Sequence, residues 1–238
     1  EHICEDGIAD TSKYHLTADA QRDLLAELNI NPVEETMAGT LKPSDLTPKK
    51  MFYTHEVEKQ VNELSKLFQQ DEFQKIQERM REKGFRNGFA CLFYGSPGTG
   101  KTETVYQLAL QTGRNIMIVD VPQIKSKWVG DSEKNIKALF DRYREVVKHS
   151  KLAPILLFNE ADAIIGKRQE GAERAVEKME NSIQNIILQE MENLDGIMIA
   201  TTNLQQNMDK AFERRFLYKI KFEKPTVEAR VSIWKAMI

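Results

Sequence analysis

One short glycine-rich stretch limits the possible folds of this chain more than any other feature of the sequence. Residues 95–102 read Gly-Ser-Pro-Gly-Thr-Gly-Lys-Thr and fit the pattern G-x-x-x-x-G-K-[ST]. An apolar run at 89–94 precedes the stretch, and a run with helical periodicity at 104–110 follows it. A glycine-rich turn between a strand and a helix lets backbone N–H groups point inward around phosphate oxygens, at the positive end of the helix. The stretch therefore predicts a phosphate-binding loop in an α/β fold.

The residue types in this loop suit a nucleoside triphosphate. Lysine at Lys101 can reach the β- and γ-phosphates, and the hydroxyl of Thr102 can bind Mg²⁺, so ATP and Mg²⁺ are the expected cofactors. A glycine-rich turn without a ligand is the alternative, and the flanking strand and helix argue against it. The residues expected to bind the nucleotide are Gly95, Ser96, Pro97, Gly98, Thr99, Gly100, Lys101 and Thr102.

Apolar runs and helical patterns alternate along most of the chain. Residues 1–50 contain one expected helix at 18–28 and several Pro-containing turns, and helical spacing of apolar residues then indicates helices at 57–68 and 73–80. Further helices are expected after residues 101, 132 and about 172, between apolar runs that read as strands. This alternation predicts a parallel sheet with crossover helices. The expected strands are 89–94, 115–120, 154–159, 196–202 and 217–222.

Composition narrows the class of protein. The formal net charge of −2 provides no overall field that would attract nucleic acid or an anionic membrane. The two cysteines, Cys4 and Cys91, lie far apart in the sequence, which favours a reducing compartment, and we expect the cytoplasm. No apolar run approaches the ~18 residues that could span a bilayer. Because the chain lacks an initial methionine and ends within a helical pattern, we expect it to be a fragment of something longer.

Polar residues follow the apolar strand at 154–159. Asn159 and Glu160 come directly after four apolar residues, and ligands of open α/β sheets bind at such carboxyl ends. In ATPases with this loop, the first polar residue acts on Mg²⁺ and a following glutamate activates the attacking water. Glu160 is therefore the expected general base, and Thr102 and Asn159 are the expected metal site. The alternative for Glu160 is a surface carboxylate at the start of a helix.

A second polar strand end carries Asn203, after the run at 196–202. If this strand lies between the strand of the phosphate loop and the strand of Glu160, the Asn203 amide is placed to orient the attacking water. A turn-forming asparagine is the alternative.

Together these motifs resemble the AAA family of ATPases over roughly residues 52–238. The quoted segments are the phosphate loop, Asn-Glu-Ala-Asp at 159–162, Ala-Thr-Thr-Asn at 200–203, and the string at 127–134, which is similar to the corresponding loop of katanin and spastin. The resemblance implies a three-layer α/β P-loop fold with five parallel strands in the order 5-1-4-3-2 and an adenine pocket near Tyr53 and His55. It also implies a helical N-terminal extension (1–51), an ATPase core (52–225) and the start of a helical lid (226–238).

The resemblance further implies a homo-oligomer, a hexameric ring, that acts on a polypeptide. An arginine from the neighbouring subunit would complete each catalytic site, and Arg214 and Arg215 are the candidates; an exposed pair bound to Glu213 is the alternative. In the family, the loop that corresponds to Lys127, Trp128, Val129 and Gly130 faces the pore and grips the substrate through its aromatic residue. A tryptophan folded back onto its own domain is the alternative. A second pore loop at 167–178 rests only on a charged run.

Asn159 departs from the family pattern, which has aspartate there. The amide keeps an oxygen that can accept a hydrogen bond from a metal-bound water but removes one negative charge, so we expect a slow ATPase with a loss of about 10- to 100-fold. Two other functions stay open. One is a nucleotide-gated scaffold that does not hydrolyse ATP, and the other is an ATPase acting on DNA, which the weak net charge does not favour.

Overall fold

The computed structural model describes residues 3–5, 14–16, 40–121, 132–166, 175–204 and 208–237. Contacts within the chain divide it into two units, Glu1–Ala38 and Gly39–Ile238. In the first unit, strands β1 (Ile3–Glu5) and β2 (Tyr14–Leu16) pair antiparallel. The helix expected at 18–28 lies outside the described residues.

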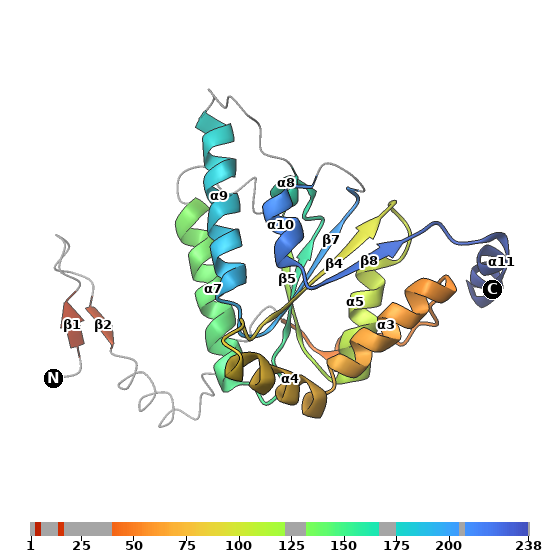
Figure 1. Ribbon diagram of the computed structural model, residues 1–238, viewed down its shortest axis with the longest axis horizontal. Coiled ribbons are helices and arrows are strands. Elements are labelled where there is room, and N and C mark those ends of the chain that lie inside the picture. Colours follow the sequence, from red (N-terminus) through yellow and green to blue (C-terminus); the bar gives the residue numbers. More distant parts are fainter. Residues whose placement is uncertain are drawn as a thin grey trace. The chain divides into compact units, whose positions relative to one another are not determined.

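The larger unit is built on a six-stranded sheet with the order β3-β5-β6-β7-β4-β8 (Figure 1). Its five long strands are parallel, and all five were expected from the sequence. Their bounds are β4 (Phe89–Gly95), β5 (Ile116–Asp120), β6 (Ile155–Asn159), β7 (Ile197–Thr202) and β8 (Tyr218–Phe222). The strand that ends before Asn203 therefore lies between the phosphate-loop strand and the Glu160 strand, as predicted.

The prediction of five strands was wrong in number, because a sixth strand, β3 (Thr40–Leu41), pairs antiparallel with the edge strand β5. Counted along the chain, the five parallel strands run 5-1-4-3-2, and β3 is added beyond the last of them. β3 has two residues and lies just before Pro43, so it has no alternating pattern that the sequence could reveal. The sheet is therefore mixed rather than fully parallel.

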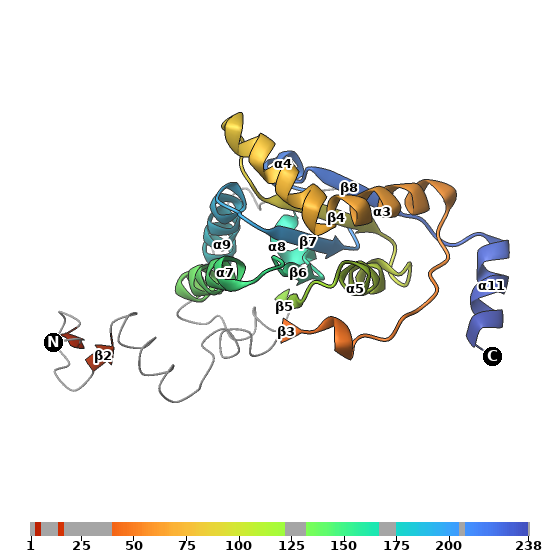
Figure 2. The same ribbon diagram turned by 90° about the horizontal axis from the view of Figure 1, so that it is seen from below.

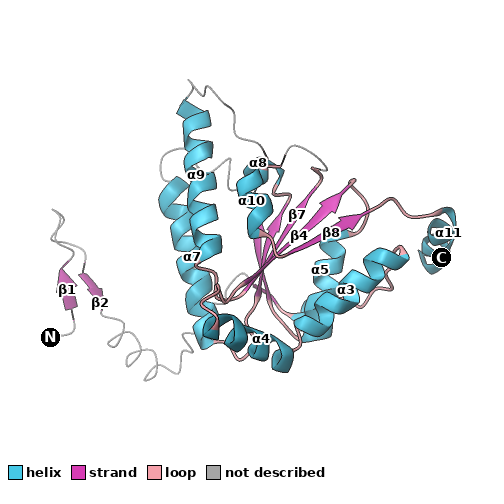
Figure 3. Cartoon of the chain, in the orientation of Figure 1, coloured by secondary structure: helices cyan, strands magenta, loops and turns pink. Residues whose placement is uncertain are grey.

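Helices cover both faces of the sheet, which makes three layers (Figure 2, Figure 3). The helices α3, α4 and α5 pack on one face, and α7, α8, α9 and α10 pack on the other. The bounds are α3 (His55–Leu67), α4 (Gln70–Glu82), α5 (Lys101–Thr112), α7 (Ser132–His149), α8 (Asp162–Ile165), α9 (Ala175–Glu192), α10 (Lys210–Arg215) and α11 (Val227–Met237). The sequence indicated all of these except the short helices α8 and α10, which hold too few residues to show a helical period.

Before their carboxyl ends the central strands are apolar, because both of their faces are buried. In β6, Leu156 and Phe158 face the α7–α9 layer, while Ile155 and Leu157 face the α3–α5 layer, and all four are at most 1% exposed. The same alternation occurs in β4 and β7. This rigid sheet fixes the carboxyl ends of β4, β6 and β7 side by side, where the polar residues lie. No helix among the described residues is both long and apolar enough to cross a membrane.

Candidate nucleotide-binding site

The phosphate loop leaves β4 and enters α5 through glycines with left-handed backbone angles. Gly98 has φ of +74° and Gly100 has φ of +89°, and Gly100 is also the N-cap of α5. A Cβ atom at Gly95 would lie 2.1 Å from the carbonyl oxygen of Phe222 on β8. A side chain at 95, 98 or 100 would therefore clash or strain the backbone, so the turn depends on glycine.

Lys101 lies inside this loop, with 8% of its surface exposed. Its ammonium group donates hydrogen bonds to the carbonyl oxygens of Gly95 and Ser96, both at 2.8 Å, and to Oδ1 of Asn203 at 3.0 Å. Burial lowers the pKa of Lys101, and the nearby carboxylate of Asp162 opposes this effect. The three protons of the ammonium group thus hold the loop in its curved form and connect it to the end of β7.

Thr102 and Asn159, the expected metal site, are in direct contact. The Thr102 hydroxyl donates to Oδ1 of Asn159 at 2.8 Å, and the Thr201 hydroxyl donates to the same oxygen at 2.9 Å. The amide oxygen of Asn159 therefore faces Thr102, which leaves a hydroxyl and an amide oxygen side by side next to the loop. Oxygen ligands of this kind are those that Mg²⁺ prefers, directly or through water.

Glu160 has a strained backbone. Its φ of +53° is the only left-handed angle of a non-glycine residue in the part of the chain that the structure describes. The Glu160 N–H donates to the Thr201 hydroxyl at 3.1 Å, and the next N–H, of Ala161, donates to the Thr201 carbonyl at 2.8 Å. Strain of this kind costs about 1–3 kcal/mol and persists where neighbouring bonds enforce it. Here the bonds to Thr201 direct the exposed Glu160 side chain into a cavity beside Lys101.

Sequence reasoning gave no role to Asp162, which organises the end of β7. Oδ1 of Asp162 accepts hydrogen bonds from the Thr202 hydroxyl, the Asn203 N–H at 2.8 Å and the Leu204 N–H at 3.1 Å. These bonds fix the backbone that carries Asn203. The Asn-Glu-Ala-Asp segment contained this residue, but only the pairing of β6 with β7 reveals its partners.

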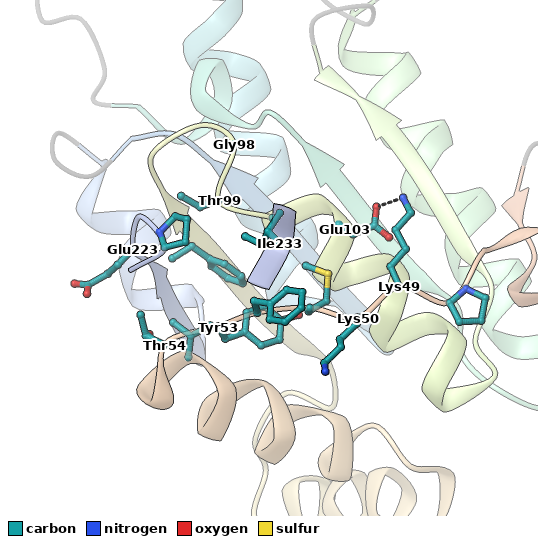
Figure 4. A pocket seen from close by; sticks show the side chains of 16 residues that line it. Lys49, Lys50, Tyr53, Thr54, Gly98, Thr99, Glu103, Glu223 and Ile233 are labelled. Carbon is teal, nitrogen blue, oxygen red and sulfur yellow. Dashed lines mark hydrogen bonds and ion pairs between the residues drawn. The ribbon is translucent and has the colours of Figure 1, made fainter. Parts of the chain in front are cut away.

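Two neighbouring cavities share the phosphate loop. The first, of about 280 Å³, is lined by Lys101, Thr102, Glu160, Asn203 and adjacent residues. The second, of about 480 Å³ (Figure 4), lies on the other side of Gly98–Gly100 and is lined largely by apolar side chains. Tyr53, predicted from the family resemblance, lines this second cavity, whereas His55 does not. A polar cavity joined to a larger apolar one has the form of a site for phosphates and a base.

The two candidate arginines differ in their surroundings, and neither lines these cavities. Arg215 donates to the carbonyl oxygens of Leu188 at 3.2 Å and Ala211 at 3.0 Å, and it forms an ion pair with Glu192. Arg214 is exposed, and no hydrogen bond or ion pair joins its side chain to another described residue. The alternative of an exposed pair bound to Glu213 is not seen among the described residues, where Glu213 pairs with Lys219.

Some predicted site residues lie outside the described residues. These include Lys127, Trp128, Val129 and Gly130, and most of the charged run at 167–178. Among the described residues, no group of three or more His, Cys, Asp or Glu side chains could hold a metal ion. The metal site expected from the sequence does not need such a group, because it consists of the Thr102 hydroxyl and the Asn159 amide next to the phosphates of a bound nucleotide.

Comparison with known proteins agrees with this geometry. The model of the ATPase family associated with various cellular activities (AAA) matches residues 91–224. Protein CdcH of Halobacterium salinarum is 35% identical over 66% of this chain and 21% of its own length, and Fidgetin-like protein 1 of Drosophila melanogaster is 30% identical over 62% and 28%. The proteasome-associated ATPase of Thermobifida fusca is 33% identical over 68% of this chain and 30% of its own length. The chain thus spans about a fifth to a third of these relatives. Because the matched segment contains the phosphate loop, the Asn159–Glu160 strand end and Asn203, the family resemblance inferred from the sequence is confirmed: this chain belongs to the AAA family and carries its ATPase domain.

Proposed function

We propose that the chain binds ATP across the two neighbouring cavities and hydrolyses it at the polar one. The observation that carries the proposal is that Lys101, Thr102, Glu160 and Asn203, from the phosphate loop and the ends of β6 and β7, line one cavity of about 280 Å³. Asn159 lies next to this cavity and accepts a hydrogen bond from Thr102. The triphosphate would lie along residues 95–102, and the base would lie in the cavity of about 480 Å³.

Mg²⁺ fits the groups present. The hydroxyl of Thr102 would hold it directly, and Oδ1 of Asn159 would hold a water bound to it, since the two atoms lie 2.8 Å apart. When bound, the ion neutralises charge on the phosphate oxygens. Asn159 is neutral, so this chain supplies less negative charge to hold the ion than an aspartate would, and turnover is expected to be slow.

The other side chains act on water and phosphate. Glu160 accepts a proton from the attacking water, and its enforced backbone angle supports this role because it directs the carboxylate into the cavity. Asn203 orients that water. Lys101 exchanges its bonds to the loop carbonyls and to Asn203 for bonds to phosphate oxygens, so nucleotide binding frees the Asn203 amide for the water.

A ring of copies, a hexamer, would complete the site. Arg214 is the better candidate for the arginine supplied to the next subunit, because it is exposed and no described residue binds it, whereas Arg215 is bound within its own domain. A guanidinium supplied in this way stabilises charge on the transferring phosphoryl group and couples hydrolysis to assembly.

In this proposal the ring uses ATP hydrolysis to remodel a polypeptide. The polypeptide passes Lys127–Gly130 in the ring pore, and Trp128 grips it. Support comes from the loop sequence and from relatives named as a proteasome-associated ATPase and a Fidgetin-like protein. A reducing cytoplasm suits Cys91, which is a buried free thiol.

A scaffold that holds ATP without turnover is the second candidate, favoured only by Asn159. Steady-state ATP hydrolysis measured against protein concentration, with Glu160→Gln as control, tests the two. Turnover that rises steeply with concentration and disappears in Glu160→Gln supports the assembled ATPase. Tight nucleotide binding with no turnover at saturating Mg²⁺ supports the scaffold and refutes the enzyme.

A further inference from the structure

One segment, residues 47–53, forms a thin wall with a cavity on each side. On one side is the cavity of about 480 Å³ assigned to the base, and on the other is a cavity of about 270 Å³ between α3 and α5. Lys49, Lys50, Met51 and Tyr53 line both. Tyr53 packs against the core beside Phe222, whereas residues 47–50 are exposed, so this part of the wall depends on hydrogen bonds for its position.

The amide of Gln107 on α5 supplies the central bonds. Its Oε1 accepts the N–H of Lys49 at 3.1 Å, and its Nε2 donates to the carbonyl oxygen of Thr47 at 3.1 Å. One side chain thus pairs with the wall as a neighbouring β-strand would. Gln107 is 7% exposed, and its Nε2 also donates to Glu103 at 2.9 Å, so its orientation is fixed.

Two further contacts attach the wall to the first turns of α5. The ammonium group of Lys49 lies 2.8 Å from a carboxylate oxygen of Glu103 (Figure 4). The Thr104 hydroxyl donates to the carbonyl oxygen of Gly100 at 2.8 Å, so its only proton is used there. The Tyr53 hydroxyl, 2.9 Å from Thr104 Oγ1, is therefore the donor in that pair. Hydrogen bonds thus run from the wall to the last glycine of the phosphate loop.

We propose that Gln107 is a positioning residue that sets the affinity of the site for the base of the nucleotide, by holding residues 47–53 as one wall of the base cavity. The inference rests on the proposed function, because it assigns the base to that cavity. Gln107 lines the cavity of about 270 Å³ behind the wall and not the base cavity, so it acts only through the wall. Loss of the Gln107 amide should therefore weaken binding of a nucleotide but not of its phosphates alone.

The test compares a fluorescent ADP analogue with inorganic tripolyphosphate as a competitor, in the full chain. Gln107→Leu removes both wall bonds while it keeps the side-chain size and the helix. The matched control is Gln111→Leu, one turn further along α5, where the amide oxygen accepts a bond from Ser65 on α3 instead of the wall. We expect the dissociation constant of the ADP analogue to rise about tenfold in Gln107→Leu and to stay within about twofold in Gln111→Leu, with tripolyphosphate binding unchanged in both.

Three results would overturn the inference. An unchanged dissociation constant for the ADP analogue in Gln107→Leu shows that the wall does not depend on the amide. Equal weakening of nucleotide and tripolyphosphate shows damage to the phosphate loop instead. If the unmodified chain binds neither ligand, the proposed function fails together with this inference. The first two results, in contrast, contradict only the role of Gln107.

Tyr53→Phe provides a second variant if Gln107→Leu does not fold. It removes only the hydroxyl that donates to Thr104, at the other end of the wall. A rise of about threefold to tenfold in the dissociation constant of the ADP analogue, with no change for tripolyphosphate, supports the proposal. The same affinity as the unmodified chain contradicts it.

Discussion

The hydroxyl of Thr102 donates a hydrogen bond to Oδ1 of Asn159 at 2.8 Å, which joins the first turn of α5 to the end of β6. In this way the chain brings a neutral amide to a position where the AAA family pattern has a carboxylate. The amide keeps the acceptor that a metal-bound water needs but not the charge that attracts the metal.

Replacement of that amide by a carboxylate should strengthen the site. We expect Asn159→Asp to lower the Mg²⁺ concentration that gives half-maximal ATP hydrolysis, or to raise turnover, by about 10- to 100-fold. Glu160→Gln is the control, because it should remove turnover in either background without loss of nucleotide binding. Unaltered Mg²⁺ dependence in Asn159→Asp would mean that the charge at this position does not limit the reaction.

Substitution of Arg214 should affect turnover, whereas substitution of Arg215 should affect the stability of the fold. Arg214→Ala is expected to reduce turnover about 1000-fold with no change in melting temperature, because no described residue binds its guanidinium. Arg215→Ala should lower the melting temperature, because its bonds to Leu188, Ala211 and Glu192 are lost. A mixture of Arg214→Ala and Glu160→Gln chains should regain part of the turnover, since some interfaces then contain an intact pair. No regain would rule out Arg214 as the arginine supplied in trans.

Trp128 should contribute to the binding of a polypeptide substrate and not to ATP hydrolysis itself. We expect Trp128→Ala to keep basal ATP hydrolysis within about twofold and to abolish the stimulation of hydrolysis by an unfolded polypeptide such as casein, because aromatic side chains offer large contact areas. Trp128→Tyr is the conservative control and should keep part of the stimulation. Loss of basal and stimulated turnover together would indicate a structural tryptophan.

Tyr143 should stabilise the sheet at the amino ends of β6 and β7. Tyr143 is 1% exposed. Its hydroxyl accepts a hydrogen bond from the N–H of Ile197 at 2.8 Å and lies within hydrogen-bonding distance of the carbonyl oxygens of Pro154 and Ile197. Tyr143→Phe removes these buried hydrogen bonds, so we expect a loss of about 2–3 kcal/mol in the free energy of unfolding, measured in urea. Tyr106→Phe is the control, because no described residue forms a hydrogen bond with that half-buried hydroxyl. Equal effects in the two variants would refute this assignment.

Alkaline pH should destabilise the fold through buried tyrosines. Burial raises the pKa of Tyr53 to about 12 and also raises that of Tyr143. An unfolded tyrosine loses its proton near pH 10, so between about pH 10 and 12 the unfolded chain binds fewer protons than the folded one, and the free energy of unfolding falls as the pH rises. Urea unfolding at several pH values checks this slope, and Tyr53→Phe should make it shallower. A free energy of unfolding that is constant from pH 10 to 12 would contradict the expectation.

The sequence by itself determined the features that are local in the chain. The phosphate loop needs glycines and a lysine at fixed spacing, and the central strands are apolar on both faces, so the loop is visible as a motif and these strands as apolar runs. The expected topology also placed the strand that ends before Asn203 between the strand of the phosphate loop and the strand of Glu160.

Only the tertiary structure decided which groups meet across long sequence separations. Asp162 binds the end of β7, Gln107 binds residues 47–49, and the side chain of Arg215, unlike that of Arg214, binds other described residues. The short strand β3 is also set by its partner β5 and not by its own residues. The physical reason is that a hydrogen bond between distant residues leaves no period in the sequence. Polar side chains such as Gln107 therefore acquire their roles only when the fold places an unpaired backbone beside them.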